Sequence, residues 1–553
     1  MSWIKKWSFA DENLNKRERL SLLCDAGARF FVGLWAFLML TVFPLYMKNH
    51  FSKLGEHKFQ FFLEVSLICL IPAAVLAFLR AAAAHAAVTT AAAPGQDKAD
   101  FSLSPLDCAM LAYGVAAFTS WKFSVNREVA WIGTEGWYGG LRTQLLLIAI
   151  YFLASRFFGW SKLVLAGHFI GSGLVFLLGI GHRFGIDPLG MYEGIDVSYQ
   201  LRFLSTIGQA TWYSSYVCTV LVIGVTLFFL TKRPVLRAGL GAYCGLGFAT
   251  VVTQNSDSAF VAMAFLCFGL FLAACDDLDR MERFLEVLIL MFGTFKAVGI
   301  FQQLFSERAM RLDGLSEFLS RSMGSWAILL FFCICYVGLQ VYRSRRPDRL
   351  IIKCGKLLRR LTVTAAVTAL CLYVLVVWAN TAGVLEKCWG IRSENTYLLF
   401  DYRWGNSRGF IWKFVCDAFG DFTLFRKLVG IGPDCFSTYC YASEDIAAYL
   451  NRFFGHEQAL TNAHNEFLNM LFCTGILGLV SYLGVFVTAL GRFFRERKKH
   501  PLALLGALAV LVYVSHNFFC YQQVCCTPFL FLILGMADSA VRNIQKTAEG
   551  DLL

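Results

Sequence analysis

Fourteen runs of mostly apolar residues follow one another along the 553 residues of this chain, and they constrain its fold more than any other feature. A helix needs about 20 mostly apolar residues to cross the hydrocarbon core of a bilayer. The runs lie at 26–47, 59–79, 106–121, 145–158, 163–180, 212–230, 238–252, 259–274, 284–304, 326–342, 361–378, 467–490, 502–519 and 528–540. They predict an all-α polytopic integral membrane protein with about 14 transmembrane helices. Because several runs are short for a span, the expected range is about 12 to 14.

The composition agrees with a membrane protein and excludes an ordinary soluble globular domain. Hydrophobic residues make up 57% of the chain and charged residues 16%, and the mean hydropathy is +0.57. These values lie outside the range of soluble domains. A net charge of +12 is compatible with nucleic acid or anionic lipid, but the basic residues are distributed as membrane topology requires. We therefore expect the lipid bilayer as a partner, and no nucleic acid.

The positions of lysine and arginine predict which side of the membrane each connection faces. With the N-terminus inside, the cytoplasmic segments hold 29 of the 50 basic residues, whereas the short outer connections hold 11. Both termini are then cytoplasmic, and the longest connection is outside. The predicted segments are a cytoplasmic N-terminal segment at 1–25, eleven spans at 26–378, a large non-cytoplasmic loop at 379–465, three spans at 466–540 and a cytoplasmic tail at 541–553. Because residues 1–19 are polar and basic, no cleavable signal peptide is expected.

Polar, aromatic and catalytic-type residues concentrate in the outer loop. The loop contains RWGNSRGFIW at 403–412, from which an amphipathic helix is expected to run to residue 425. VGIG follows at 429–432, and NAHNEFL at 462–468 leads into a span that contains GILG at 475–478. Their order, spacing and place between late spans resemble the O-antigen ligase and O-antigen polymerase superfamily of membrane glycosyltransferases. The resemblance is specific from about 403 to 480 and looser from about 130 to 535.

Two earlier segments resemble the same superfamily less closely. The first is RFLSTIG at 202–208, which leads into the sixth span, although Gln209 stands where the superfamily frequently has asparagine. The second is the connection at 253–258, where the superfamily often carries Ser-Arg. Here Ser256 is followed by Asp257, so no arginine role is implied at that place.

The resemblance implies a reaction and its partners. The donor would be a glycan on undecaprenyl pyrophosphate, and the acceptor a hydroxyl of a second glycan or of a lipid. Transfer would occur on the outer face of a bacterial inner membrane, by one inverting displacement, with no metal and no other cofactor. Both a ligase, which uses a foreign acceptor, and a polymerase, which uses another lipid-linked glycan, remain open.

Arginine side chains are the candidates for binding the leaving pyrophosphate. Negative charge grows on its oxygens as the bond breaks, and guanidinium groups hold phosphates bidentately. Arg408 and Arg202 are the predicted ligands, with Arg403 in reserve. The alternative for each is a side chain that extends to the membrane interface or forms a structural ion pair.

Histidine is the side chain best suited to take the acceptor's proton near neutral pH. His464 is the predicted base, and a nearby arginine would hold it neutral by opposing protonation. The alternative is a structural residue where the loop re-enters the membrane. His516 is a competitor at the outer end of the thirteenth span. Lys296 lies within a span, so it is expected either to touch the lipid pyrophosphate or to pair with a carboxylate.

No metal site is expected. His456, Glu457, His464 and Glu466 fit no zinc template, and the acidic run at 276–279 is expected to be a solvated cytoplasmic hairpin. The outer loop also holds four cysteines, Cys388, Cys416, Cys435 and Cys440. They form at least one disulfide if the outer compartment is oxidising, or they stay as buried thiols.

The main alternative is a multi-span transporter or flippase of lipid-linked glycans. Such a protein is expected to carry charged residues along a central path and helices broken by glycine or proline. Most runs here lack charge, and the polar residues gather in one outer loop. This distribution favours the glycosyltransferase.

Overall fold

The computed structural model describes residues 16–88, 102–200, 202–275, 277–345, 351–456 and 459–542. In these ranges the chain is nearly all helical, and its two strands, β1 (Phe203–Leu204) and β2 (Gly208–Gln209), form one short antiparallel pair. Most of the predicted cytoplasmic tail and part of the N-terminal segment lie outside the described residues, as do Asp276 and Glu457. The all-α polytopic class is confirmed.

Each of the fourteen predicted runs falls on a helix. These helices are α2 (Lys16–Phe37), which continues as the π-helix η1 (Leu38–Val42), α3 (Leu54–Val88), α4 (Pro105–Lys122), α6 (Leu141–Phe157), α7 (Lys162–Arg183), α9 (Ala210–Leu230), α10 (Pro234–Thr253), α11 (Asp257–Ala274), α12 (Leu278–Leu304), α14 (Met323–Arg345), α15 (Ile351–Thr381), α21 (Glu466–Glu496), α22 (Ala503–Asn517) and α23 (Thr527–Val541). Among the described residues, ten spans are long and apolar enough to cross a membrane. The ten omit α4, α6, α22 and α23, so the count of fourteen stays a prediction.

The alanine-rich stretch that begins at residue 81 is helical, not a loop, as far as the structure describes it. Helix α3 continues to Val88. Alanine has the highest helix propensity of all residues, so a low-complexity alanine run extends a preceding helix unless glycine or proline interrupts it.

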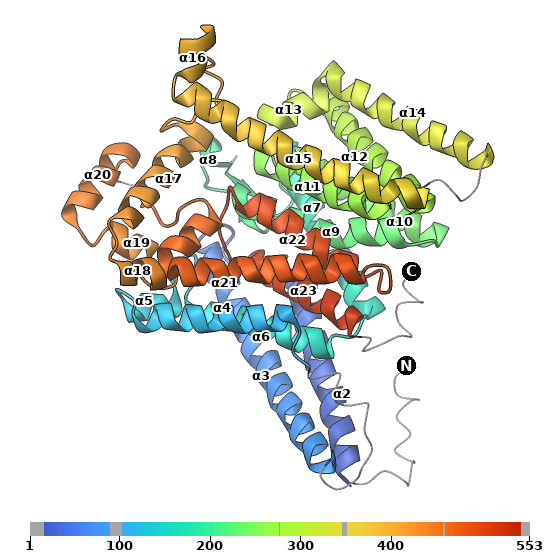
Figure 1. Cartoon of the computed structure of the whole chain (residues 1–553), viewed down its shortest axis with the longest axis vertical. Helices are drawn as coiled ribbons and strands as arrows, with labels where there is room; N and C mark the ends of the chain where they lie inside the picture. The colour runs from blue at the N-terminus through green and yellow to red at the C-terminus, as the bar shows by residue number, and fades with distance from the viewer. Residues whose placement is uncertain are drawn as a thin grey trace.

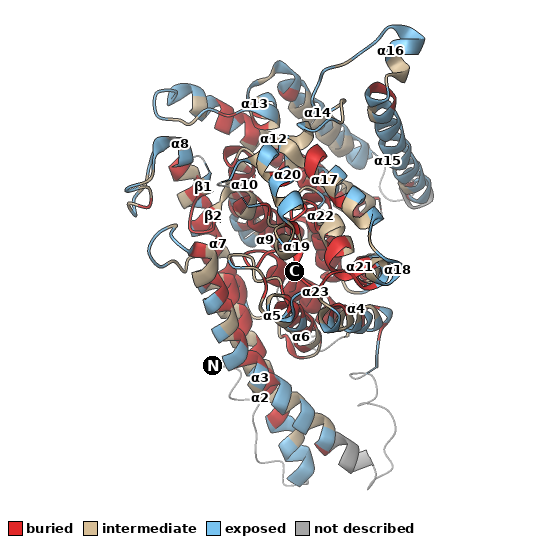
Figure 2. Ribbon diagram, turned by 90° about the vertical axis from the view of Figure 1, so that its left-hand side faces the viewer, coloured by how far each residue is buried: buried red, intermediate tan, exposed pale blue. Residues whose placement is uncertain are grey.

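The helices at the centre of the bundle differ from those at its edge. In α9, 94% of the residues in its apolar 18-residue stretch are buried, whereas the buried shares in α14 and α15 are 6% and 0%. Figure 2 shows the same contrast, with α9 and α22 among buried elements and α15 exposed at one side. The exposed sides of α14 and α15 are apolar, which suits contact with lipid.

The outer loop folds into five helices. They are α16 (Val384–Trp389), α17 (Trp404–Gly420), α18 (Leu424–Val429), α19 (Phe436–Cys440) and α20 (Glu444–Phe454). The expected single helix to residue 425 is wrong, because α17 ends at Gly420 and the side chain of Thr423 caps α18 by accepting a hydrogen bond from the Arg426 N–H at 3.3 Å. The loop has its own apolar core, made of Phe410, Ile411, Val415, Ile431, Phe436, Leu450 and neighbouring side chains.

Shorter elements complete the fold. They are α5 (Arg127–Ile132), α8 (Val197–Gln200) and α13 (Gly314–Arg321). All three belong to connections that the charge pattern places on the outer side.

Connections predicted to share a side of the membrane meet one another in the structure. Asp434 of the outer loop accepts hydrogen bonds from the backbone of Thr134 (2.7 Å) and Gly139 (2.9 Å), in the connection between α5 and α6. On the other side, Arg542 after α23 pairs with Asp107 at the start of α4. Figure 1 shows α17 to α20 near one end of α21, with α16 apart from them at the end of α15.

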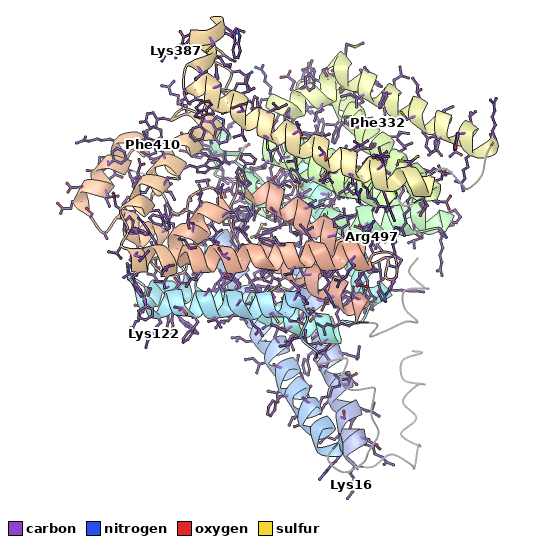
Figure 3. The ribbon with its side chains drawn as sticks, in the orientation of Figure 1. Lys16, Lys122, Phe332, Lys387, Phe410 and Arg497 are labelled. Atoms are coloured by element: carbon purple, nitrogen blue, oxygen red, sulfur yellow. The ribbon has the colours of Figure 1, made fainter. Side chains whose placement is uncertain are left out.

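The labelled side chains in Figure 3 agree with this division. Lys122 and Lys387 come from predicted outer connections and lie on one side of the picture, as does Phe410. Arg497, from a predicted cytoplasmic connection, lies on the opposite side. These positions agree with the predicted division, and the predicted segments and the assignment of one face to the cytoplasm stay predictions.

Cysteine labelling would test this assignment. A membrane-impermeant thiol reagent is expected to label Ser443→Cys on intact cells or spheroplasts and to leave Ser344→Cys unlabelled. The background should replace Cys354, Cys388 and Cys416, which are exposed thiols near the same connections. Permeabilised cells, in which both sites should react, are the control. Labelling of the Ser344 position alone would invert the orientation.

Candidate functional site

His464 stands immediately before α21, where local hydrogen bonds fix its backbone. The side chain of Asn465 caps the helix by accepting from the N–H groups of Phe467 (2.9 Å) and Leu468 (3.0 Å). The His464 N–H donates to Asn462 Oδ1 at 2.9 Å. His464 has a φ of +47°, which is uncommon for a residue other than glycine and often accompanies a functional constraint.

The surroundings of the His464 imidazole favour its neutral form. The side chain is half-buried, and its ring lies edge-on to Tyr521 with the ring centroids 5.4 Å apart. Burial, followed by the charge of Arg408, lowers the pKa of His464 to about 4. In the described part of the chain no side chain hydrogen-bonds its ring nitrogens, so a lone pair is available at neutral pH.

Arg408 lies in α17, directly after three residues with left-handed backbone. Gly405, Asn406 and Ser407 have φ values of 60°, 61° and 69°. The Arg408 guanidinium donates to the carbonyl of Gly405 at 2.5 Å and twice to the carbonyl of Phe519, at 3.1 and 2.8 Å. A guanidinium has five N–H donors, so two remain for a ligand.

Tyr521 joins the parts of the site. It lies in the connection between α22 and α23, donates to Gln209 Oε1 at 3.0 Å, and accepts from Trp212 Nε1 at 3.3 Å. Its ring also meets that of Trp137 edge-on, with centroids 4.8 Å apart. A small cavity of about 10 Å³, room for about one water molecule, is lined by Trp137, Thr143, Gln522, Gln523, Thr527, Pro528 and neighbouring residues.

The other two predicted arginines are not joined to His464 by the contacts that the structure describes. Arg202 is exposed, and its guanidinium lies over the ring of Tyr199 at 4.8 Å. Arg403 is exposed at the N-terminal end of α17. The segment that contains Arg202 nevertheless reaches the site, because Gln209 at its end binds Tyr521. Pyrophosphate binding by Arg202 and Arg403 stays a prediction.

His516 is buried, and both of its ring nitrogens are engaged. Nε2 lies 2.8 Å from Ser214 Oγ and 3.2 Å from Ser258 Oγ, and Nδ1 lies 3.0 Å from Asn517 Oδ1. The side chain is 1% exposed. These contacts leave no lone pair for an acceptor hydroxyl, so His516 fits a supporting position better than that of a base.

Lys296 does not pair with a carboxylate. Its ammonium donates to the Ser322 carbonyl at 2.9 Å and to Ser325 Oγ at 2.8 Å, and it lies over the Trp326 ring at 4.9 Å. Of the two expected contacts, the carboxylate pair is therefore not found among the described residues, and contact with the lipid pyrophosphate stays a prediction. Hydroxyl and carbonyl oxygens from the start of α14 meet the hydrogen-bonding need of this lysine.

Buried charges are balanced in different ways on the two faces of the protein. On the face opposite His464, Asp107 pairs with Arg156 and Arg542 at 3.2 and 2.5 Å, and Asp538 pairs with Arg492 and Arg542 at 2.5 and 2.6 Å. Opposite charges meet there, and the local positive potential is largely cancelled.

On the His464 face, buried cations are held by neutral oxygens. The four are Lys58, Arg183, Lys296 and Arg408, which donate to backbone carbonyls or a serine hydroxyl. In the described ranges none of the four forms an ion pair with a carboxylate. Cations without a carboxylate partner favour the approach of an anion. The same face also holds Glu466 and Asp434, carboxyl groups whose described partners are neutral donors.

The cysteines of the outer loop are not bridged. Cys388 and Cys416 are exposed free thiols, and Cys435 and Cys440 are buried free thiols. The alternative of buried thiols therefore holds for the last two, which pack in the apolar core of the loop. Within the described residues no group of three or more His, Cys, Asp and Glu side chains is placed to hold a metal ion.

Residues 309–483 match the O-antigen ligase family. This match covers about a third of the chain and includes both Arg408 and His464. It confirms the resemblance drawn from the loop motifs. No curated protein matches the chain.

Proposed function

Because residues 309–483 form an O-antigen ligase domain, we propose that the chain transfers a glycan from undecaprenyl pyrophosphate to an acceptor hydroxyl. The domain supports a membrane glycosyltransferase function in the assembly of surface polysaccharide. The observation that carries the proposal is the neutral His464 beside Arg408, a half-buried guanidinium held by backbone carbonyls.

Arg408 acts on the leaving group in this proposal. As the bond from the sugar C1 to the pyrophosphate oxygen breaks, charge develops on the phosphate. Two N–H groups of Arg408 do not donate to carbonyls, and they can donate hydrogen bonds to the phosphate oxygens on which that charge develops. Because Phe519 and Gly405 hold the guanidinium in advance, little reorganisation is needed during the reaction.

His464 acts on the acceptor. The acceptor oxygen forms a bond to C1 on the face opposite the leaving group, and its proton passes to a ring nitrogen of His464. The undecaprenyl pyrophosphate departs in the same step, so one bond forms as the other breaks, and the configuration at C1 inverts. The low pKa of His464 leaves its ring unprotonated at neutral pH but makes it a weak base, so the proton passes to it as the acceptor oxygen bonds to C1.

Reconstitution would test the proposal. The purified protein in liposomes, given a fluorescent glycan on undecaprenyl pyrophosphate, is expected to release the lipid pyrophosphate and extend an acceptor. A product ladder from the donor alone identifies a polymerase, whereas a single product that requires a separate acceptor identifies a ligase. Movement of the intact lipid-linked glycan across the bilayer without bond cleavage would favour the flippase and contradict the proposal.

The pH dependence gives a second test. Burial is the larger cause of the low pKa of His464, and the charge of Arg408 is the smaller one. We expect the wild-type turnover rate to stay level from pH 8 to about 5 and to fall as His464 is protonated near pH 4. Arg408→Gln removes a positive charge that opposes protonation. The acid limb of the residual activity, which is the fall in rate at low pH, should therefore lie at a higher pH than in the wild type, still below the ordinary histidine pKa of 6.5.

The control for the pH test is Arg452→Gln, which removes an exposed charge from α20. Its acid limb should coincide with that of the wild type. If the Arg408→Gln limb also stays in place, Arg408 does not influence the ionisation of His464.

A further inference from the structure

Glu466 is a buried carboxylate whose described partners include no cation. It is the first residue of α21, two positions after His464, and is 1% exposed. Its oxygens accept from the hydroxyls of Tyr482 and Tyr513 and from Asn517 Nδ2, the last two at 3.0 and 2.5 Å. A carboxylate without a cation is costly to bury. The hydrogen bonds to Glu466 offset part of this cost, and they also connect it to other parts of the site.

The hydrogen bond from Asn517 to Glu466 sets the orientation of the next groups. Because Nδ2 donates to Glu466, the Asn517 Oδ1 faces His516 Nδ1 at 3.0 Å and the Ser215 hydroxyl at 3.4 Å. A carbonyl oxygen can only accept, so His516 carries its proton on Nδ1. Its Nε2 then accepts from Ser214 and Ser258, which ties the end of α22 to α9 and α11.

The same end of α22 presents the carbonyl that holds Arg408. The chain turns after Asn517, with the Phe519 N–H donating to the His516 carbonyl at 3.1 Å and the Cys520 N–H to the Asn517 carbonyl at 3.3 Å. The Phe519 carbonyl then points to Arg408 and accepts two of its hydrogen bonds. The Glu466 carboxylate therefore links the start of α21, beside His464, to the turn after α22 whose Phe519 carbonyl binds Arg408.

We propose that Glu466 is a positioning residue that sets the Arg408 guanidinium relative to His464. This inference rests on the proposed glycan transfer. A carboxylate suits the position because donors converge on it from α21 and α22, and it has only acceptors to offer. An amide in its place would direct an N–H against one of those donors, which would move Asn517 and the turn at Phe519.

Reversing the polarity of the pair tests the proposal. Glu466→Gln turns an N–H toward one of the donors that now bind the carboxylate, and Asn517→Asp places two carboxylates face to face. Each should lower the transfer rate by about 10- to 100-fold, as expected for partners in one buried network. In the double variant Glu466→Gln/Asn517→Asp, the amide donates to the carboxylate in the opposite direction. We expect it to recover at least about tenfold over the worse single variant.

The acid limb of the pH profile separates positioning from a merely structural role. If Glu466→Gln moves Arg408 away from His464, the limb should shift upward, as in Arg408→Gln. Asp107→Asn is the matched control, because Asp107 is a buried carboxylate on the opposite face. It should lower the thermal stability and leave the limb in place.

The outcomes are distinct. Absence of transfer by the wild-type protein would remove the proposed function, and this inference with it. With an active wild type, two results would overturn the role of Glu466 alone. The first is a Glu466→Gln variant with the wild-type rate and acid limb. The second is a double variant no faster than the slower single one.

Discussion

Replacement of His464 by asparagine is expected to abolish glycan transfer while donor binding stays near the wild-type level. A general base contributes about 10²- to 10⁴-fold to a rate, and it does so in the transition state more than in the bound ground state. Asparagine is the informative substitution because it tolerates a positive φ better than alanine does. The backbone at +47° is therefore kept while the basic nitrogen is lost. Initial rates and equilibrium binding of the lipid-linked donor are the measurements.

His516→Asn is the comparison that decides between the two histidines. His516 is buried, and serine and asparagine side chains engage both of its nitrogens. Its loss should lower the unfolding temperature and reduce the rate in part. A His464→Asn protein with full transfer activity would end the assignment of His464 as the base. An inactive His516→Asn protein of normal stability would move that assignment to His516.

The spans were predictable because their signal is local. An apolar run of sufficient length must be helical in a bilayer, where backbone polar groups have no water to bind. The ends of the helices were less predictable. The run at 502–519 corresponds to α22, which has only 15 residues and is roughly 22 Å long at 1.5 Å per residue. The turn that follows α22 holds Arg408 through the Phe519 carbonyl, and nothing in an apolar run reveals that contact.

The sequence predicted those parts of the site that depend on the type of a side chain, and missed those that depend on backbone groups. His464 is followed by Asn465, a helix cap visible in the sequence, and Arg408 lies in a conspicuous motif. The group that holds Arg408 is the carbonyl of Phe519, and a backbone carbonyl leaves no sequence signal. Gln209 was noted only as a departure from the superfamily pattern, yet it is the residue that reaches Tyr521.

The remaining errors of prediction concern contacts between residues that are far apart in the sequence. Lys296 was expected either to touch the lipid pyrophosphate or to pair with a carboxylate, but in the described residues it donates to Ser322, before α14, and to Ser325, at the start of α14. Glu466 was seen only as part of a motif, since its partners Tyr513 and Asn517 come from a different helix. Such contacts depend on how the helices pack. The local pattern of a single sequence does not contain that information.

Arg408→Ala is expected to weaken donor binding and to reduce the transfer rate by at least about 10²- to 10³-fold, the range for loss of one preorganised donor to a developing charge. Arg408→Lys should recover only part of the loss. An ammonium retains the charge but cannot span the Phe519 and Gly405 carbonyls and a phosphate with one planar group. The binding constant for the lipid-linked donor and the transfer rate should be measured for both variants.

Arg452→Ala, which removes an exposed arginine of the same loop, is the control and should resemble the wild type. If Arg408→Lys matches the wild type in both measurements, charge alone suffices at this position and the bidentate role is wrong. If Arg408→Ala keeps full binding and rate, the pyrophosphate is held elsewhere, and Arg202 and Arg403 become the residues to test.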